Sequence, residues 1–127
     1  LVLSVEEFVR PGETLSAYRA GRFAGGKGLN QSVALARAGA EVSHVGAIGS
    51  DGLWLRDFLQ AEGVDISGIM VGGGLSGLAM IQVRGDGENA IVLSPGANRE
   101  IDPHLIHTAI RRLPAGSWFL CQNETNA

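Results

Sequence analysis

The order of hydrophobic and polar residues predicts a parallel β-sheet with helices on its faces. Short β-branched runs closed by glycine or polar residues are typical of buried strands, and longer segments with hydrophobic residues three and four apart are typical of helices. The strands expected in this way are 42–48, 66–71 and 116–121, and the helices are 30–38, 51–62 and 103–113. Strands that alternate with helices indicate an α/β domain, with the last strand buried in its sheet.

A second group of segments does not fit this layer. Residues 1–9 and 14–23 alternate only weakly, whereas residues 78–84 and 89–93 form a clear hairpin around Gly85-Asp86-Gly87. We expect these segments to form a small β-sheet lid, with strands within about residues 1–24 and 77–94. No linker or change in composition interrupts the chain, so residues 1–127 are expected to belong to one domain.

Composition excludes several classes of protein. The chain has 127 residues and a net charge of −3, which supports one hydrophobic core and argues against nucleic-acid binding. No apolar run approaches the roughly 18 residues of a membrane-spanning helix, so no membrane association is expected. Cys121 is the single cysteine, which excludes an internal disulfide and favours a reducing, cytoplasmic location. It is expected to be a small core residue rather than a nucleophile.

Candidate chemistry gathers where glycines precede a helix. The 19 glycines are about twice the usual share, and Gly25-Gly26-Lys27-Gly28 leads directly into the helix expected at 30–38. Free N–H groups at a helix start suit an anion or polar hydroxyls, Lys27 adds a cation, and Asn30 offers a donor and an acceptor. Glu124, just past the last expected strand, can accept two hydroxyl hydrogen bonds. Lys27 is followed by Gly28 and Leu29, whereas a nucleotide-binding P-loop requires Ser or Thr directly after the lysine, so this motif is excluded. The alternative to a ligand site is a plain glycine turn before the helix.

The longer stretch AGGKGLNQSVALARAGAEVSHVGAIGSDG strongly resembles the first signature of the ribokinase family of carbohydrate kinases, also called the PfkB family. The matching positions are Gly25, Gly26, Asn30, Gly39, Gly49 and Asp51. The segments RPGET, SGLAMIQVRGDGENAIVLSPGAN and QNET at residues 10–14, 76–98 and 122–125 add to the resemblance, which covers essentially the whole chain. Lys27-Gly28 and Gln31 are most similar to the branch from which the family takes its name.

The resemblance implies a cytoplasmic kinase that transfers the γ-phosphoryl group of ATP to a sugar hydroxyl, most simply of D-ribose. It implies a three-layer, Rossmann-like α/β fold with a β-sheet lid that pairs with the lid of a second subunit in a homodimer. The sugar ligands that it implies are Gly25, Gly26, Lys27, Asn30 and Glu124, with Ala79, Ile81 and Leu93 as the apolar wall of the lid.

The departures from the family pattern are equally informative. The first strand of the family carries an Asn-x-Asp motif, and its second half carries Gly-Ala-Gly-Asp and Asn-x-x-Glu; none of these occurs here. The catalytic base and the sites for ATP, Mg²⁺ and a monovalent cation are therefore expected outside this chain, which holds no catalytic residue. We expect residues 1–127 to be an incomplete domain, the N-terminal and sugar-binding portion, inactive alone.

Other interpretations remain open. The alternative substrates are 2-deoxyribose, fructose and a nucleoside. The alternative functions are a non-catalytic sugar-binding or assembly module and a scaffold whose glycine loop binds nothing. His44, His104 and His107 show no metal-ligand spacing and favour structural or surface roles. Asp51 is expected to cap a helix.

Overall fold

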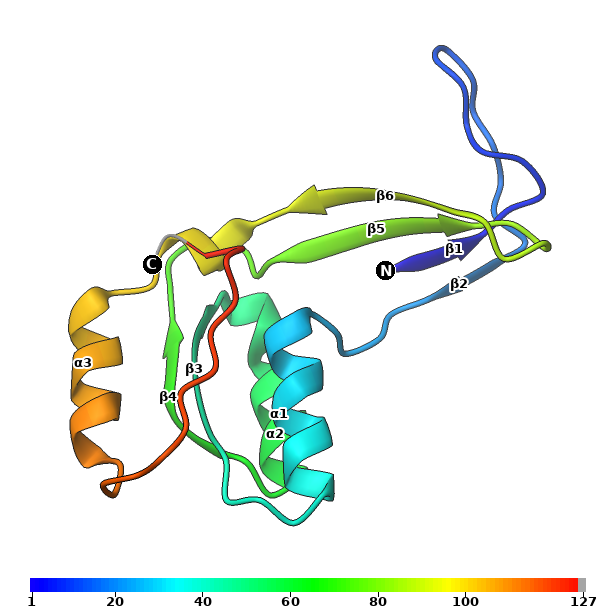
Figure 1. Ribbon diagram of the computed structural model, residues 1–127. Coiled ribbons are helices and arrows are strands. Elements are labelled where there is room, and N and C mark those ends of the chain that lie inside the picture. Colours follow the sequence, from blue (N-terminus) through cyan, green and yellow to red (C-terminus); the bar gives the residue numbers. More distant parts are fainter. Residues whose placement is uncertain (126–127) are drawn as a thin grey trace. The chain divides into compact units, whose positions relative to one another are not determined.

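The computed structural model describes residues 1–125 and divides the chain into two compact units (Figure 1). The first unit consists of Leu1–Phe23 and Leu78–Ser94. The second consists of Ala24–Gly77 and the residues from Pro95 onward. The chain passes from one unit to the other at the ends of the expected lid segments; a lid function for the first unit stays a prediction.

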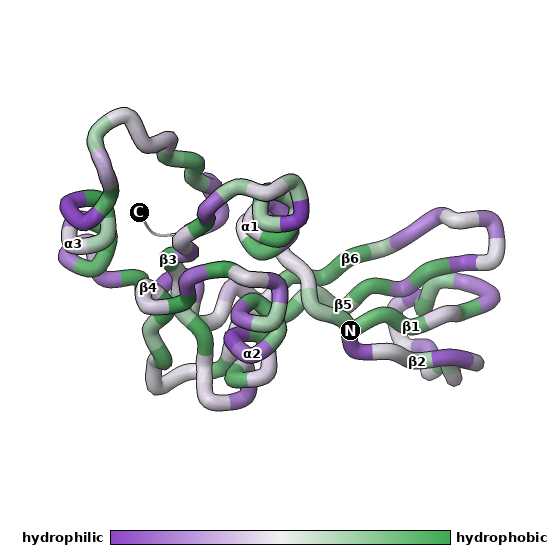
Figure 2. Tube along the Cα trace, turned by 90° about the horizontal axis from the view of Figure 1, so that it is seen from below, coloured by the Kyte–Doolittle hydropathy of each residue, from purple (hydrophilic) through white to green (hydrophobic). Residues whose placement is uncertain are grey.

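The first unit is a four-stranded sheet with the strand order β2-β1-β5-β6. Its strands are β1 (Val2–Ser4), β2 (Arg19–Gly21), β5 (Leu78–Val83) and β6 (Asn89–Ser94). The β5–β6 hairpin closes through Gly87, whose φ of +90° favours glycine, and through the Gly87 N–H, which donates to the Arg84 carbonyl at 3.0 Å. Figure 2 shows the two strands as largely hydrophobic and the turn between them as hydrophilic.

The second unit has three layers. Its sheet consists of the parallel strands β3 (Ser43–Ile48) and β4 (Asp65–Val71). Helices α1 (Lys27–Arg37) and α2 (Leu53–Ala61) lie on one side of these strands, and α3 (Pro103–Arg112) lies on the other (Figure 1). The 3₁₀ turns η1 (Ser50–Gly52) and η2 (Gly96–Arg99) complete the unit. The expected α/β architecture with a parallel sheet flanked by helices is thereby confirmed.

A β-bulge in β4 decides which side chains face which helices. Ser43 pairs with Asp65 and Val45 with Gly68, so β4 uses one more residue than β3 over this interval. Alternation of side chains restarts after the bulge, and Ile69 therefore faces the same side as Ile66 rather than the opposite one.

Two hydrophobic clusters fill the spaces on either side of β3 and β4. Val33, Leu59 and Val64 form the first, under α1 and α2, and Leu59 is the most deeply buried large side chain of the described residues, at 2% exposure. Ala47, Ala97 and Ile101 form the second, with Met70 and Ile106 packed against them. Each helix face is thus held to the sheet by removal of apolar surface from water.

The helix ends follow from capping chemistry. Asp102 accepts a hydrogen bond from the His104 N–H at 2.8 Å, and Pro103 occupies the first position of α3, as predicted. Helix α1 begins at Lys27, three residues before the predicted start at residue 30, because Gly26 takes a φ of +105° at its N-cap. Lys27 and Gly28 are therefore helical rather than part of a loop.

The prediction of a buried strand at residues 116–121 is wrong. This segment has no strand structure, and Trp118, Phe119 and Leu120 are 97%, 60% and 61% exposed. A strand requires a hydrogen-bonded neighbour, and within residues 1–125 the strand β3 pairs only with β4. Cys121 is exposed as well, so the expectation of a core cysteine is also wrong.

Asp51 does not cap a helix, contrary to expectation, since neither η1 nor α2 has a side-chain cap. Its Oδ1 instead accepts from the Ser76 N–H and hydroxyl, both at 2.9 Å, and the buried Ser76 hydroxyl accepts from the Gly49 N–H at 3.0 Å. These bonds tie the segment that follows β4 to the end of β3. Among residues 1–125, no helix has the length and apolarity needed to cross a bilayer.

Candidate functional site

The candidate site is built on the first turn of α1. The positive φ of Gly26 turns the chain into the helix, and the first intrahelical bond of the turn runs from the Asn30 N–H to the Gly26 carbonyl at 2.9 Å. Gly26 is the N-cap of α1 and has no side chain that could accept a hydrogen bond. The N–H groups that precede Asn30 in the helix therefore have no acceptor from the cap residue. The positive end of the helix dipole lies at this turn.

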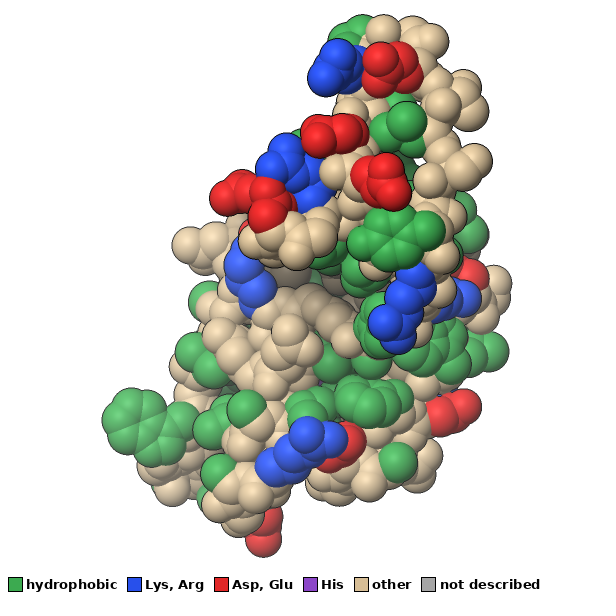
Figure 3. All heavy atoms as spheres, turned by 90° about the vertical axis from the view of Figure 1, so that its right-hand side faces the viewer, with side chains coloured by type: hydrophobic (Ala, Val, Ile, Leu, Met, Phe, Trp, Pro, Cys, Tyr) green, Lys and Arg blue, Asp and Glu red, His purple; other side chains and the backbone are tan. Residues whose placement is uncertain are grey.

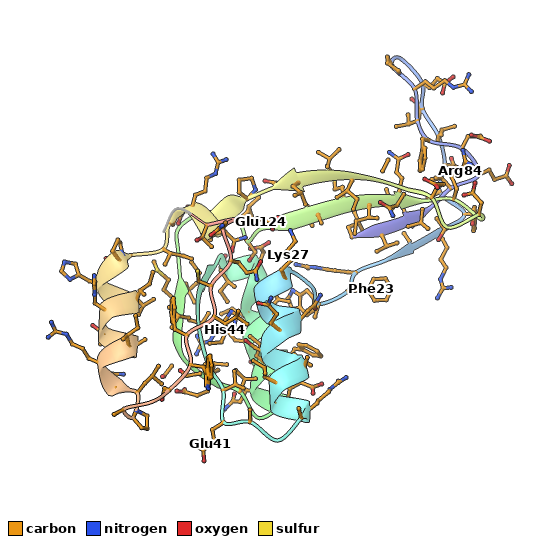
Figure 4. All side chains as sticks on the ribbon, in the orientation of Figure 1. Phe23, Lys27, Glu41, His44, Arg84 and Glu124 are labelled. Carbon is orange, nitrogen blue, oxygen red and sulfur yellow. The ribbon has the colours of Figure 1, made fainter. Side chains whose placement is uncertain are left out.

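Glu124 lies against this turn. Its Oε1 forms an ion pair with the Lys27 ammonium, although the two residues are 97 positions apart in the sequence (Figure 4). The two side chains remain 62% and 57% exposed. The helix start thus presents a cation, a carboxylate and backbone N–H groups that solvent can reach.

A second polar contact lies one helical turn away from this ion pair. The Gln122 Nε2 donates to the Gln31 Oε1 at 2.8 Å. Gln31 lies four residues after Lys27 on the same face of α1, and Gln122 lies two residues before Glu124, where the chain makes a turn. Two successive contacts therefore fix the register of residues 122–124 against α1.

His44 belongs to β3, and its ring lies against α1 (Figure 4). Its Nδ1 is 2.8 Å from the hydroxyl of Ser32, which is itself buried on α1. Burial lowers the pKa of His44 below its ordinary value, because the imidazolium form loses hydration there. The ring is therefore neutral near pH 7 and takes part in a hydrogen bond between neutral groups.

The predicted sugar ligands fall into two groups. Gly25, Gly26, Lys27 and Asn30 lie at the start of α1, and the structure brings Glu124 to the same place through Lys27. In the first unit, Ala79 pairs with Leu93 across the hairpin, and Ile81 lies two residues along β5, so these three side chains share one face of the sheet. Their role as sugar ligands stays a prediction.

Sequence reasoning missed the residues that support the site: Gln31, Ser32, His44 and Gln122. The Gln31–Gln122 contact had no local sequence signal, because it joins positions 91 residues apart. The Ser32–His44 contact had none, because it depends on how α1 crosses β3.

A surface hollow of about 510 Å³ lies elsewhere, in the first unit. Its wall includes Arg84, which pairs with Asp86 and, at 3.5 Å, with Glu7. Figure 3 shows acidic and basic side chains interleaved on the face that it draws. Since none of the predicted ligands lines this hollow, we assign it no role.

The described residues contain no cluster of metal-ligating side chains. In residues 1–125, no three His, Cys, Asp or Glu side chains lie together in a way that would hold an ion. No step through a metal ion is therefore derived from this chain.

Comparison with known proteins agrees with this fold. Residues 1–125 match the pfkB family of carbohydrate kinases, and the chain belongs to that family. It is 39% identical over 127 residues to the ribokinase of Haemophilus influenzae, a match that covers 98% of this chain and 42% of that protein. The chain therefore spans less than half of the length of this relative.

Solved structures give the same result. The ribokinase of Cryptococcus neoformans in complex with ADP is 38% identical with a TM-score of 0.76, over 98% of this chain and 38% of that protein. The Arabidopsis thaliana ribokinase complexed with ribose and ATP is 31% identical with a TM-score of 0.69, over 78% of this chain and 33% of that protein. The family expected from the glycine-rich signature is confirmed.

Proposed function

We propose that this chain is the sugar-binding portion of an ATP-dependent sugar kinase, and that the sugar is D-ribose. The observation that carries the proposal is the meeting of Lys27 and Glu124 at the start of α1, in a chain of the pfkB family. Ribose is proposed because the relative from Haemophilus influenzae is a ribokinase and the Arabidopsis thaliana ribokinase was solved with ribose and ATP.

The chemistry of the pair suits an uncharged polyol. The Glu124 carboxylate accepts hydrogen bonds from two neighbouring hydroxyls, while the Lys27 ammonium donates to a hydroxyl oxygen. Asn30 and the N–H groups of the helix start add further donors. The ion pair is exposed and therefore weak, so a sugar can insert between the two groups at little cost. The net charge of the pair is zero, which suits a neutral ligand better than a phosphate.

The remaining parts of the reaction belong to the whole protein, the polypeptide that contains this chain. ATP is proposed as the donor because nucleotides are bound in the solved relatives. Phosphoryl transfer rests on positioning and on charge stabilisation by metal ions and hydrogen-bond donors. The catalytic base, Mg²⁺ and any monovalent cation are therefore assigned to segments outside this chain. We further propose that the first unit closes over the sugar through Ala79, Ile81 and Leu93 and pairs with a second subunit.

The proposal is tested with the variants Glu124→Ala and Asn30→Ala of the whole protein, in steady-state assays with ribose and ATP. Each removes hydrogen bonds to the sugar, one of them charge-assisted for Glu124, so we expect the KM for ribose to rise about 10- to 100-fold. The KM for ATP stays within about twofold, because neither residue belongs to the nucleotide site. Glu41→Ala, an equal change at an exposed position before β3, is the matched control. Equal increases for ribose and ATP would contradict the assignment.

The same assays separate the alternative sugars. With ribose, 2-deoxyribose, fructose and a nucleoside offered in turn, ribose should give the highest kcat/KM. A higher value for another sugar would overturn the choice of ribose and keep the kinase. Sugar binding without any phosphoryl transfer by the whole protein would favour a non-catalytic binding module.

A further inference from the structure

The imidazole of His44 occupies a space that two glycines leave open. A Cβ added to Gly28 would lie 3.6 Å from His44 Cε1, and one added to Gly46 would lie 3.2 Å from His44 Nε2. The ring therefore fills the gap between the first turn of α1 and the strand β3. A side chain at Gly46 would crowd the ring, whereas one at Gly28 would meet it at an ordinary van der Waals distance, so the place of the ring depends on the glycine at position 46.

The same turn of α1 lies close to Gln122, two residues before Glu124. The added Cβ of Gly28 would also touch the side chain of Gln122, at 4.0 Å from its Cγ. Gln122 in turn donates to Gln31, one helical turn beyond Lys27. Gly28 thus faces both His44 and Gln122, directly beside Lys27, the first residue of the helix.

We infer that His44 is a positioning residue for the proposed sugar site: its ring, oriented by Ser32, supports the turn at Gly28 and so sets the distance between Lys27 and Glu124. The inference rests on the proposed function. The Ser32 hydroxyl holds the ring through Nδ1 at 2.8 Å, and Ser32 is fixed by burial on α1. Loss of the ring would let the first turn of α1 sink toward β3 and misplace the Lys27 ammonium.

The charge state of the ring suits this role. Burial alone lowers the pKa of His44, and no charged side chain of the described residues contributes to the shift. The elements packed around the ring present the Ser32 hydroxyl, Gly28 and Gly46, and the charged side chains at this end of α1 are Lys27 and Glu124. A neutral ring of fixed position is therefore kept near pH 7.

Three substitutions at His44 in the whole protein separate support by the ring from the hydrogen bond. His44→Ala removes both, His44→Asn keeps a polar atom near the position of Nδ1, and His44→Phe keeps the ring. In His44→Phe, the Ser32 hydroxyl can bond back to the carbonyl four residues earlier in α1. We expect the KM for ribose to rise about 10-fold in the Ala and Asn variants and about twofold in the Phe variant.

The KM for ATP and kcat at saturating ribose should stay within about twofold in all three variants. His104→Ala, at an exposed histidine of α3, is the matched control and should leave every parameter unchanged. An unchanged KM for ribose in His44→Ala would overturn the inference. So would a reversed order, with the Asn variant near wild type and the Phe variant impaired, because the hydrogen bond would then matter rather than the ring.

A measurement on the wild-type protein avoids any variant that fails to fold. On addition of ribose, the NMR signal of the His44 Cε1–H group should move while those of His104 and His107 stay in place. An unmoved His44 signal in the ribose-bound protein would contradict the inference. If the protein neither binds nor phosphorylates ribose, the proposed function fails instead. The inference is then judged by the backbone amide signals of Gly28 and Glu124, which should move in His44→Ala and stay in place in His104→Ala.

Discussion

The Gln122 side chain donates to Gln31 at 2.8 Å and thereby aligns the segment after α3 with the first turns of α1. One turn away, the next contact of the same register joins Lys27 to Glu124. The bond between the two uncharged amides is partly buried and holds the backbone, whereas the ion pair stays open to solvent. This division of roles between neighbouring contacts is the basis for the first prediction.

Lys27→Met should separate function from stability. The ion pair is exposed, so its loss is expected to change the free energy of unfolding of the whole protein by less than about 1 kcal/mol. The KM for ribose should rise about 10-fold, because a charged donor to the sugar is lost. Urea unfolding and steady-state kinetics on the same preparation measure both effects. A large loss of stability with an unchanged KM would show that the pair is structural.

Gly26→Ala tests the entry into α1. At φ +105° the backbone suits glycine, and a side chain there should cost about 1–3 kcal/mol of stability. The neighbouring Gly25 has no positive φ, and a Cβ added to it meets nothing within 4 Å, so Gly25→Ala should leave stability nearly unchanged. Thermal unfolding of the two variants measures the two losses of stability. Equal losses in both would mean that the backbone angle at Gly26 is not what matters.

Ser76→Ala tests the link between the ends of β3 and β4. The substitution removes the hydroxyl bond to Asp51 and leaves the Gly49 N–H without its acceptor in a buried place, which should cost about 1–3 kcal/mol. Ser67→Ala is the matched control, since Ser67 also bonds to an aspartate, Asp65, but at an exposed position. Its cost should be below about 0.5 kcal/mol. Urea unfolding curves that coincide for the two variants would contradict this account.

The pH dependence of stability has a definite sign at His44. Its folded-state pKa is lowered from 6.5, so between that lowered value and 6.5 the unfolded chain binds more protons than the folded one. Stability is therefore complete above about pH 6.5 and is lost as the pH falls toward the folded-state pKa. His44→Phe should flatten this part of the profile, whereas His104→Phe should not. Chemical denaturation from pH 7.5 to 5.0 measures the difference, and parallel profiles for wild type and His44→Phe would refute it.

The proposed pairing of two subunits predicts the effect of a charge on the hairpin. Met80 and Val92 face each other across β5 and β6, on the side opposite Ala79 and Leu93, and are 43% and 60% exposed. Val92→Asp places a charge on this apolar face and should convert a dimer of the whole protein to monomers. Glu88→Gln, in the turn, should leave the dimer intact. Sedimentation equilibrium provides the measurement, and a persistent Val92→Asp dimer would exclude this face.

Local signals explain what the sequence predicted well. The hairpin at residues 78–93 follows from alternation and from the Gly85-Asp86-Gly87 turn, and the start of α3 follows from Asp102 and Pro103. Each of these depends on residues within a few positions of one another. The same holds for the glycine-rich turn before α1, although the start of that helix was placed three residues too late.

Non-local relations explain what the sequence did not predict. Residues 116–121 have the composition of a strand but no neighbouring strand to pair with among the described residues. The bond of Asp51 to Ser76 joins positions 25 residues apart, and no local pattern distinguishes it from a helix cap. Lys27 and Glu124 were expected to act together through the family resemblance, because spacing alone does not connect them.

The extra residue in β4 also limits how this protein can change over evolution. The side of the sheet that each later residue of β4 faces depends on its position relative to the bulge. A strand of the same length without the bulge would turn Ile69 toward α3 and Met70 toward α1 and α2. Substitutions at these positions can therefore accumulate one at a time, whereas the bulge can be lost only together with one residue of β4.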